Sequence, residues 1–521
     1  MKSPWLACGL LVVATLAEAE VGPPGGVGAG AEPASAAISG VMPDTRSSSL
    51  PDTGGAMVSA ALSSTLPASA AVPPVVVIND PLLQSAGSWG QSRPDQWGLY
   101  QIGLYRDGGQ PLSRYPLQLE PVRVALIDSG LDYTHPDLGI EPLWRNPDEK
   151  PNGRDDDGNG YIDDLIGWNF VDNNNNPWDD QGHGTHVAGI ISARRDNGIG
   201  ISGIAPNARL MVLKVVDASG HAAGPDIAAA LRYAVDKGAQ LIQLSLGGAE
   251  PGPEELDALR YALEREAVVV IAAGNRASGD LSLGYERLTG PLVVGAATPQ
   301  GERAPFSDWG PALDLLAPGV DILSLRARGS DFLRTIGAPD YQPGSAVVQQ
   351  DYYRATGTSF AAPFVTGVAA LILGRDPWLE PPQLQRMLLQ SAADRGPTGI
   401  DQLSGYGLLD ADAALVASPQ RFVDARLLSV QVSRERQLEL LGVADADRFA
   451  RAELSYGLGE APPNWQLIDT LTQPSDSGVI ARVDPATLPK GRTLTLRLQV
   501  WHQDGTRRES WLQLALPGAS Q

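Results

Sequence analysis

Residues 240–273 read QLIQLSLGGAEPGPEELDALRYALEREAVVVIAA and hold two short apolar segments on either side of a helical one. Residues 240–246 and 267–273 have the length and apolar content of strands that are buried on both faces. Residues 254–266 carry apolar side chains at helical spacing. A strand, a helix and a strand in this order form a right-handed crossover between parallel strands. The stretch therefore predicts an α/β fold with a mainly parallel sheet covered on both faces.

The same alternation extends in both directions from this stretch. Further strands are predicted at 122–127, 209–216 and 292–297, and further helices at 187–193 and 226–237. Residues 359–374 are nearly all small or apolar, which predicts a helix buried in the core. Together these elements predict one three-layer domain over residues 76–418.

Three other segments differ from this domain in composition. Residues 1–19 have a basic start, an apolar run too short to span a bilayer and small residues at the end, which indicates a signal peptide. A lipid anchor at Cys8 is the alternative. Residues 20–75 are rich in Gly, Ala, Pro and Ser and predict a low-complexity spacer or an atypical propeptide. Residues 419–521 form the fourth segment.

Residues 419–521 change from helical to alternating periodicity. The runs at 427–432 and 494–500 alternate apolar and polar residues, and turns such as Asp504-Gly505 separate the runs. This pattern predicts a small C-terminal all-β, sandwich-like domain. For its tryptophans at 465, 501 and 511, core packing is favoured over contact with carbohydrate or protein.

The charge and cysteine content restrict the function. The 521 residues carry a formal net charge of −21, and the excess of acidic residues lies entirely before residue 419. This field has the wrong sign for nucleic acid or an anionic membrane surface. The single cysteine lies within the predicted signal peptide, so the mature chain can form no disulfide. Bound cations are an alternative means of stabilising such a protein outside the cell.

Three short motifs bring together the groups needed for acyl transfer. They are ALIDSG at 125–130, GHGTHVAG at 182–189 and GTSFAAP at 357–363. Acyl transfer needs a nucleophile, a base and a group that orients the base, and Ser359, His183 and Asp128 supply these types. Singly, each motif also fits a turn or a helix cap. Asp128 ends a predicted strand, and Ser359 and His183 begin helices, so all three can meet at one sheet edge.

In the order Asp, His, Ser, these motifs resemble the subtilisin-like serine peptidases, or subtilases, from about residue 79 to 418. The resemblance implies that Asp128 orients His183, which acts as general base and acid, and that Ser359 is the nucleophile. The segment AAGN at 272–275 resembles the family's oxyanion segment, which implies that the Asn275 amide stabilises the tetrahedral oxyanion. Residues 405–411 resemble the segment that closes the family's domain.

The resemblance also implies where an extended substrate pairs with the chain. The substrate would lie between two segments of the chain, one at 245–248 and the other at 219–220, and would pair with both. Main-chain pairing is indifferent to sequence, so broad protein or peptide substrates are expected. The implied substrate-binding residues are Ser219, Gly220, Ser245, Leu246 and Gly247.

An acidic loop predicts a first calcium site. In DDDGNGYIDD at 155–164, oxygen-bearing residues recur at every second position and Gly160 stands at position six, as in an EF-hand. Position twelve is Ile166 rather than Glu, so another carboxylate must close the shell. A solvated acidic loop is the alternative. The candidate ligands are Asp155, Asp157, Asn159, Tyr161, Asp163 and Asp164.

Two further calcium sites follow from the family resemblance. Asn169, Asp172, Asn174 and Asn176 resemble a calcium loop of some thermostable subtilases, with fewer carboxylates. The loop at 196–203 resembles the family's strong calcium loop. The implied ligands there are Asp80, Asp137, the Asn197 side chain, and the backbone carbonyls of Arg195, Ile199 and Ile201.

These observations lead to one expected function. The chain is expected to be a secreted, calcium-stabilised serine endopeptidase, extracellular or periplasmic, that acts as a monomer on proteins or peptides. It is expected to have no nucleic-acid partner and no membrane association once the signal peptide is removed. A processing peptidase of narrow specificity and an inactive binding scaffold with the same fold are the alternatives.

Overall fold

The computed structural model describes residues 78–515, except for 107–109, 112–117, 247–250, 280, 282–289, 329–345, 477 and 490–492. The predicted signal peptide and spacer, Cys8 and Gly247 therefore lie outside the described residues. The predicted division into four segments stays a prediction. All the described residues belong to one compact unit.

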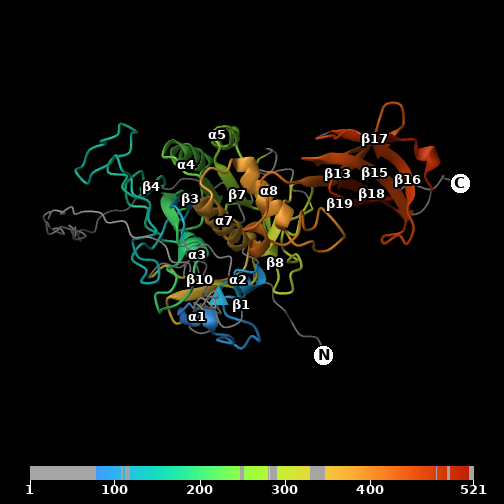
Figure 1. The fold of residues 1–521 in the computed structure, drawn as a ribbon. Coiled ribbons are helices and arrows are strands. Elements are labelled where there is room, and N and C mark those ends of the chain that lie inside the picture. The colour runs from blue at the N-terminus through green and yellow to red at the C-terminus, as the bar shows by residue number, and fades with distance from the viewer. Residues whose placement is uncertain are drawn as a thin grey trace, which may run out of the picture. The chain divides into compact units, whose positions relative to one another are not determined.

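A seven-stranded parallel sheet forms the centre of the fold (Figure 1). Its order is β4-β5-β3-β6-β7-β8-β9, and every neighbouring pair is parallel. The strands are β3 (Val122–Asp128), β4 (Gly167–Asn169), β5 (Ala208–Lys214), β6 (Leu241–Leu244), β7 (Val268–Ala272), β8 (Leu292–Ala297) and β9 (Leu315–Pro318).

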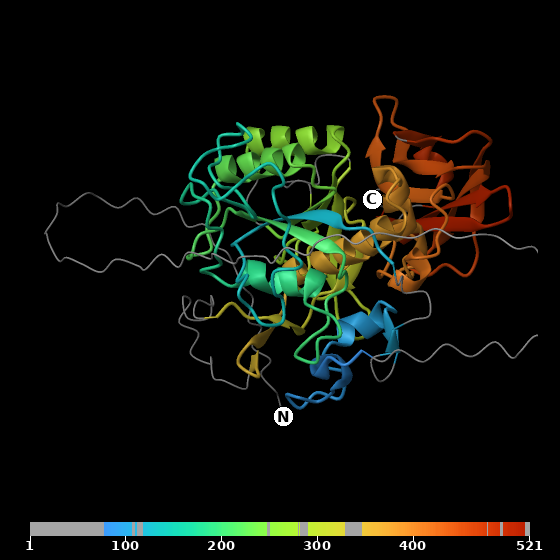
Figure 2. The ribbon, with the colours of Figure 1, turned by 60° about the vertical axis from the view of Figure 1, so that its left-hand side comes forward.

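Helices cover both faces of this sheet, as Figure 2 shows. One face packs against α3 (His183–Ser192) and α7 (Thr358–Arg375), and the other against α4 (Gly224–Asp236) and α5 (Pro253–Glu264). Within β3, Val124 and Leu126 join the first core, while Ala125 and Ile127 join the second. Successive side chains of a strand point to opposite faces, so one apolar strand supplies both layers. The predicted three-layer arrangement is present.

Helix α7 lies inside the domain. It is long and apolar enough to cross a membrane, but 89% of its apolar window is buried in the protein. Its contacts with α3 and the central sheet account for this composition. The structure thus agrees with the buried helix predicted at 359–374.

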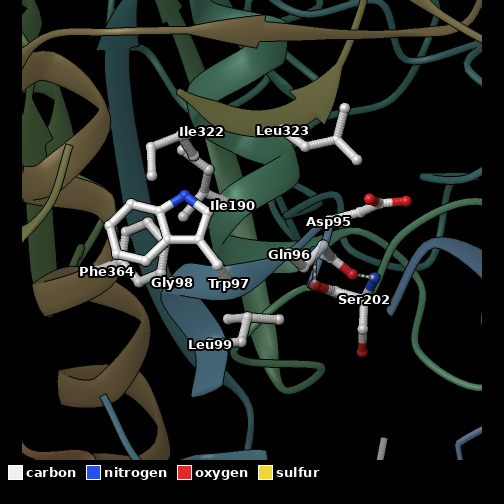
Figure 3. A pocket seen from close by; sticks show the side chains of 10 residues that line it. All are labelled: Asp95, Gln96, Trp97, Gly98, Leu99, Ile190, Ser202, Ile322, Leu323 and Phe364. Carbon is white, nitrogen blue, oxygen red and sulfur yellow. Dashed lines mark hydrogen bonds between the residues drawn. The ribbon is translucent and has the colours of Figure 1, made fainter. Parts of the chain in front are cut away.

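Smaller elements surround the central layers. They are α1 (Pro81–Gln84), α2 (Trp97–Gln101), β1 (Tyr105–Arg106), β2 (Gln110–Pro111), β10 (Ile322–Leu325), β11 (Val347–Val348), β12 (Tyr352–Ala355), α8 (Pro381–Ser391) and α9 (Ala411–Ala414). β10, β12 and β11 form an antiparallel sheet. The N-terminal segment packs beside β10, where a small pocket is lined by Trp97, Ile190 and Phe364 (Figure 3). Gln96 closes its polar side with two hydrogen bonds to the backbone of Ser202.

The C-terminal strands build a separate antiparallel core. The two sheets have the orders β13-β14-β17 and β16-β15-β18-β19, and inward side chains such as Leu440, Leu454 and Leu496 form the core. This is the predicted all-β region. The elements are β13 (Val423–Val432), β14 (Leu438–Ala446), β15 (Phe449–Leu458), β16 (Gln466–Leu471), β17 (Val479–Val483), η2 (Pro485–Thr487), β18 (Thr493–His502) and β19 (Arg507–Ala515).

Candidate active site

The residues of the three motifs lie at the carboxyl edge of the parallel sheet or at helix starts beside it. Asp128 is the last residue of β3, His183 the first of α3 and Ser359 the second of α7. Ser245 directly follows β6, and Asn275 follows β7 after a short turn. Carboxyl ends of parallel strands share one edge, which is where open α/β sheets form their sites.

His183 is held by a buried carboxylate. Its Nδ1 donates to Asp128 Oδ1 at 2.7 Å, and the Asp128 side chain is fully buried while that of His183 is 19% exposed. The backbone N–H of Ser129 donates to the same oxygen at 2.7 Å. A Cβ at Gly184 would lie 2.2 Å from the carbonyl oxygen of Gly130. The glycine after His183 thus lets α3 approach the end of β3.

The surroundings change the basicity of His183. Burial disfavours the imidazolium, but the charge of Asp128 and its hydrogen bond outweigh burial and raise the pKa of His183 above 6.5. The more distant carboxylate of Asp179 acts in the same direction. This environment stabilises the protonated ring. A general base needs this, because it must accept a proton during the reaction.

Ser359 and Ser245 are joined by two reciprocal hydrogen bonds. Ser359 Oγ donates to the carbonyl oxygen of Ser245 at 3.1 Å, and Ser245 Oγ donates to the carbonyl oxygen of Ser359 at 2.8 Å. The second bond has a clear origin, because Pro363 lacks the N–H that would otherwise bond this carbonyl within α7. The His183 ring lies 5.2 Å from the ring of Phe360, which places the imidazole beside the start of α7.

Asn275 is oriented by the first turn of α7. Its Oδ1 accepts from the N–H of Thr358 at 2.9 Å and from Thr358 Oγ1 at 3.1 Å. The amide oxygen is thereby occupied, and Nδ2 is left to donate. Gly274 before it has φ of +109°, and a Cβ there would lie 2.4 Å from Asp308 Oδ2. The turn therefore needs glycine at this position.

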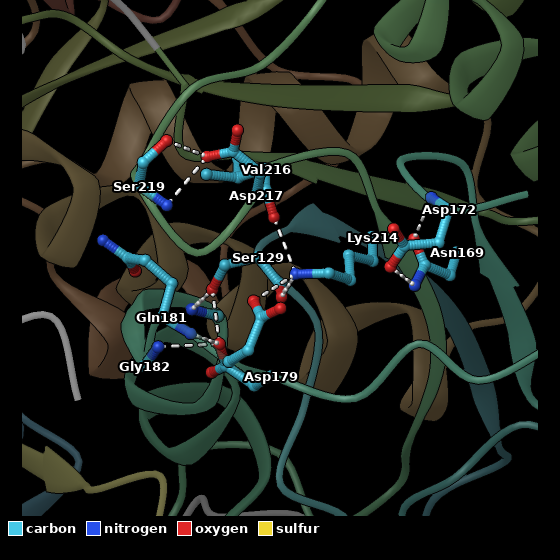
Figure 4. A network of polar contacts seen from close by, with 12 residues as sticks. Ser129, Asn169, Asp172, Asp179, Gln181, Gly182, Lys214, Val216, Asp217 and Ser219 are labelled. Carbon is cyan, nitrogen blue, oxygen red and sulfur yellow. Dashed lines mark hydrogen bonds and ion pairs between the residues drawn. The ribbon is translucent and has the colours of Figure 1, made fainter. Parts of the chain in front are cut away.

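A second buried carboxylate, Asp179, joins the two segments that carry Asp128 and His183. Its Oδ1 accepts from Ser129 Oγ at 2.8 Å and from the N–H of Gly182 at 2.7 Å (Figure 4). Its Oδ2 accepts from the N–H of Thr185 at 2.9 Å. No motif in the sequence predicted a role for this residue. Its position shortly before GHGTH was the only available signal, and exposed turns also contain such aspartates.

The residues expected to bind substrate lie on two segments after β5 and β6. Ser245 and Leu246 follow β6, which is next to β3 in the sheet. Ser219 and Gly220 follow β5, on the other side of β3, in a turn where Asp217 Oδ1 accepts from Ser219 N and Oγ at 2.9 and 2.6 Å. The two segments therefore lie on either side of the end of β3.

The acidic loop gathers three carboxylates, one of which the sequence analysis missed. Oxygens of Glu149, Asp155 and Asp157 lie within 4.8 Å of one another. Glu149 is 7% exposed, and its Oε1 accepts from the N–H groups of Asp156 and Asp157. Its Oε2 is buried and has no hydrogen-bond partner among the described residues. Spacing could not reveal Glu149, because it precedes the loop pattern.

The other predicted residues of this loop bond elsewhere. Asp163 accepts from the N–H groups at 152 and 153, and the fully buried Asp164 accepts from Tyr233 Oη at 2.5 Å and Asn159 Nδ2 at 2.9 Å. Asn159 Oδ1 accepts from the N–H of Tyr161 at 2.6 Å. These contacts shape the loop around the three carboxylates.

The two remaining predicted cation sets also come together. Asp80 and Asp137 are fully buried, and Asn197 contacts both, through its N–H at 3.0 Å and its Nδ2 at 2.8 Å. Burial raises the pKa of Asp137 to about 7. The predicted carbonyl ligands at 195, 199 and 201 belong to the same loop, whose N–H at 201 also bonds Asp137. Asn169, Asp172, Asn174 and Asn176 form a turn closed by bonds within the set.

Comparison with known proteins identifies the family of this chain. The model of the subtilase family matches residues 120–407. Subtilisin Savinase from Lederbergia lenta is 33% identical over 326 residues, which cover 63% of this chain and 97% of that protein. An alkaline protease from Alkalihalobacillus alcalophilus is also 33% identical over 326 residues, covering 63% and 69%. Among solved structures, a lanthipeptide protease matches 57% of this chain and 89% of its own at 26% identity, with a TM-score of 0.45.

The family match includes all three motifs and the central sheet that carries them. The resemblance and the fold class predicted from the sequence are confirmed. This chain belongs to the subtilase family and is a subtilisin-like serine endopeptidase.

Proposed function

We propose that the chain is a secreted, calcium-stabilised endopeptidase in which Asp128, His183 and Ser359 form the catalytic triad. The observation that carries this proposal is the 2.7 Å contact from His183 Nδ1 to the buried Asp128, beside the start of α7. This contact fixes the tautomer in which Nε2 is free to accept a proton. Secretion rests on the signal-peptide pattern at residues 1–19.

Acylation begins when Ser359 Oγ leaves its contact with Ser245 and attacks the substrate carbonyl carbon. His183 Nε2 takes the hydroxyl proton, and Asp128 stabilises the resulting imidazolium. The tetrahedral oxyanion accepts from Asn275 Nδ2 and from the N–H of Ser359, which lies in the first turn of α7 and has no intrahelical acceptor. His183 then donates its proton to the leaving amine, and the acyl-enzyme remains.

Deacylation repeats these steps with water as the nucleophile. His183 takes a proton from water as the oxygen attacks the acyl carbon, and the same donors hold the second oxyanion. Collapse of this intermediate returns the proton to Ser359 Oγ and releases the new carboxyl group. The segments at 219–220 and 245–246 hold the substrate backbone through main-chain pairing, which favours unfolded proteins of varied sequence.

A fluorophosphonate probe tests the proposed function directly. It reacts with a serine only when a neighbouring base activates the hydroxyl, so wild-type protein that lacks residues 1–75 should be labelled, with the adduct on Ser359 in a peptide map. An unlabelled preparation that is folded by circular dichroism would exclude the proposed mechanism. It would favour the inactive scaffold instead.

The Asn275→Ala variant should lower kcat by about two to three orders of magnitude with little change in KM, because the amide acts mainly on the transition state. Asn275 also holds the N–H of Thr358, so the melting temperature must be measured with the kinetics. Asn275→Asp keeps this acceptor but loses the donor, and it should be similarly slow. An active Asn275→Asp enzyme would assign the oxyanion to other donors.

The proposed calcium role is best supported at the acidic loop. Glu149, Asp155 and Asp157 offer carboxylate oxygens, the ligands that calcium prefers. The buried Oε2 of Glu149 needs a hydrogen-bond donor or a cation, which the described residues do not provide at that atom. When bound, the ion would supply the positive charge and hold the loop in place. Asp80, Asp137 and Asn197 form the second candidate site.

Removal of calcium should lower the melting temperature of the protein by about 4 °C for each ion lost, because an ion at 100 times its dissociation constant contributes about 2.7 kcal/mol to the folded state of this large domain. Calorimetry with and without a chelator measures this shift, with autolysis prevented by Ser359→Ala. Glu149→Gln should reduce the shift, whereas Glu141→Gln, on an exposed residue paired with Arg194, should preserve it. Identical melting with and without chelator would contradict the proposal.

A further inference from the structure

Lys214 is a buried lysine that the proposed mechanism does not use. It is the last residue of β5, lies opposite Asp128 in the parallel register, and its side chain is 1% exposed. Lysine is seldom buried unless its charge and its donors are satisfied. Here Nζ donates to the carbonyl oxygens of Ser129 and Val216, both at 2.8 Å (Figure 4). It also donates to Asp180 Oδ1 at 2.6 Å.

The two carbonyl groups belong to different parts of the site. Ser129 directly follows Asp128 at the end of β3. Val216 starts the turn that carries Ser219, which is closed by a bridge between Val216 and Ala222. Lys214 therefore joins the chain after β3 to the chain after β5, where the N–H groups of 215 and 216 also bond the carbonyl oxygen of Asp128.

The ion pair is the most exposed of the three contacts. The Asp180 side chain is 43% exposed, so water screens part of its attraction for the buried ammonium group. The carbonyl groups are different, because Ser129 is fully buried and Val216 is 6% exposed. Without Nζ, two buried acceptors would lose a charged donor, and the chain would have to shift to satisfy them.

We propose that Lys214 is a positioning residue that couples the triad segment at Asp128 to the turn that pairs with extended substrates. This inference rests on the proposed function, since it needs a substrate strand beside Ser219. It predicts that Lys214 matters most for substrates long enough to reach that turn. Binding energy from such remote contacts raises the rate at the reacting bond, so its loss affects kcat as well as KM.

The test compares two substrates with the same residue before the cleaved bond. One is an extended tetrapeptide anilide, and the other is a single-residue ester that cannot reach the turn at Ser219. In Lys214→Met, kcat/KM should fall for both substrates. The ratio of kcat/KM for the extended substrate to kcat/KM for the short one should fall about tenfold or more. An unchanged ratio would overturn the inference, because a general loss of structure lowers both substrates alike.

Two further variants give decisive results even if Lys214→Met does not fold. Asp217→Ala loosens the same exposed turn without removing Lys214, and the ratio must fall there also. Asp180→Asn removes the counter-charge but keeps an acceptor at Oδ1 and both carbonyl contacts. It should lower the melting temperature, because Lys214 is buried, but the ratio should stay within about twofold of wild type. An unchanged ratio in Asp217→Ala, or a tenfold fall in Asp180→Asn, overturns the inference.

Fluorophosphonate labelling separates this inference from the proposed function. If wild-type protein is not labelled, the proposed triad fails and the ratio has no meaning. If wild-type protein is labelled and the ratio is unchanged in Lys214→Met and Asp217→Ala, the triad stands and only the role of Lys214 fails.

Discussion

Ser359→Ala should lose about six orders of magnitude in kcat, the loss known for removal of the nucleophile from another subtilisin. In the proposed mechanism this hydroxyl forms the covalent bond to the acyl group, so its removal should abolish the acyl-enzyme route. The fold should survive, because Ser359 Oγ makes one 3.1 Å hydrogen bond, to Ser245. Kinetics on a peptide anilide, with the melting temperature measured in parallel, test both statements.

A small residual rate should remain in this variant. Asn275 and the backbone donors of α7 would still stabilise an oxyanion formed by direct attack of water. Such a site retains a rate enhancement of about three to four orders of magnitude over the uncatalysed reaction. Ser433→Ala, in the C-terminal region, is the matched control and should keep full activity. Activity of Ser359→Ala within a hundredfold of wild type would mean that another residue is the nucleophile.

Asp128→Asn should lower kcat by about four orders of magnitude, because an amide does not enforce the tautomer that leaves Nε2 free. Asp128 also sets the basicity of His183. Its charge and hydrogen bond raise the pKa of His183 against the opposing effect of burial. In the variant the burial effect is opposed only by the charge of Asp179, so the pKa should fall below its wild-type value.

The pH profile reports this change with a definite sign. A general base works only when unprotonated, so kcat/KM of wild type should rise with pH through the pKa of His183, above 6.5. In Asp128→Asn this rising limb of the pH profile should move to lower pH. Asp132→Asn removes another buried carboxylate, which bonds Thr134 and Arg328 rather than His183, and should leave the limb in place. A limb that stays unmoved in Asp128→Asn would assign the titration to another group.

The sequence predicted the layers of the fold because their signals are local. Residues 241–244 and 268–272 form strands with the predicted helix between them, since strand length and helical spacing are encoded within a few residues. Element ends were less accurate. Periodicity alone marked a helix only at 187–193, because Gly182 and the polar residues of the first turn show no apolar period. α3 begins at His183, the start that the GHGTH motif had indicated.

The C-terminal tryptophans show where composition misleads. Core packing was favoured, but Trp465, Trp501 and Trp511 are half-buried and lie outside the apolar core of that region. Trp465 packs on Trp511 at 5.1 Å, and Arg497 lies 4.2 Å above the Trp465 ring. Successive residues of a strand point to opposite faces, and leucines already fill the inward positions of β18.

The sequence by itself determined the parallel sheet, its covering helices and the residue types of the proposed triad, because periodicity and short motifs are read within one segment. The tertiary structure alone decided which distant groups become hydrogen-bond or charge partners of these elements. Lys214 reaches Ser129 across 85 residues of sequence, Ser245 replaces the donor that Pro363 lacks, and Glu149 completes the acidic cluster. Such partners are selected by burial, since a buried charge or carbonyl group must find a partner wherever the fold brings one.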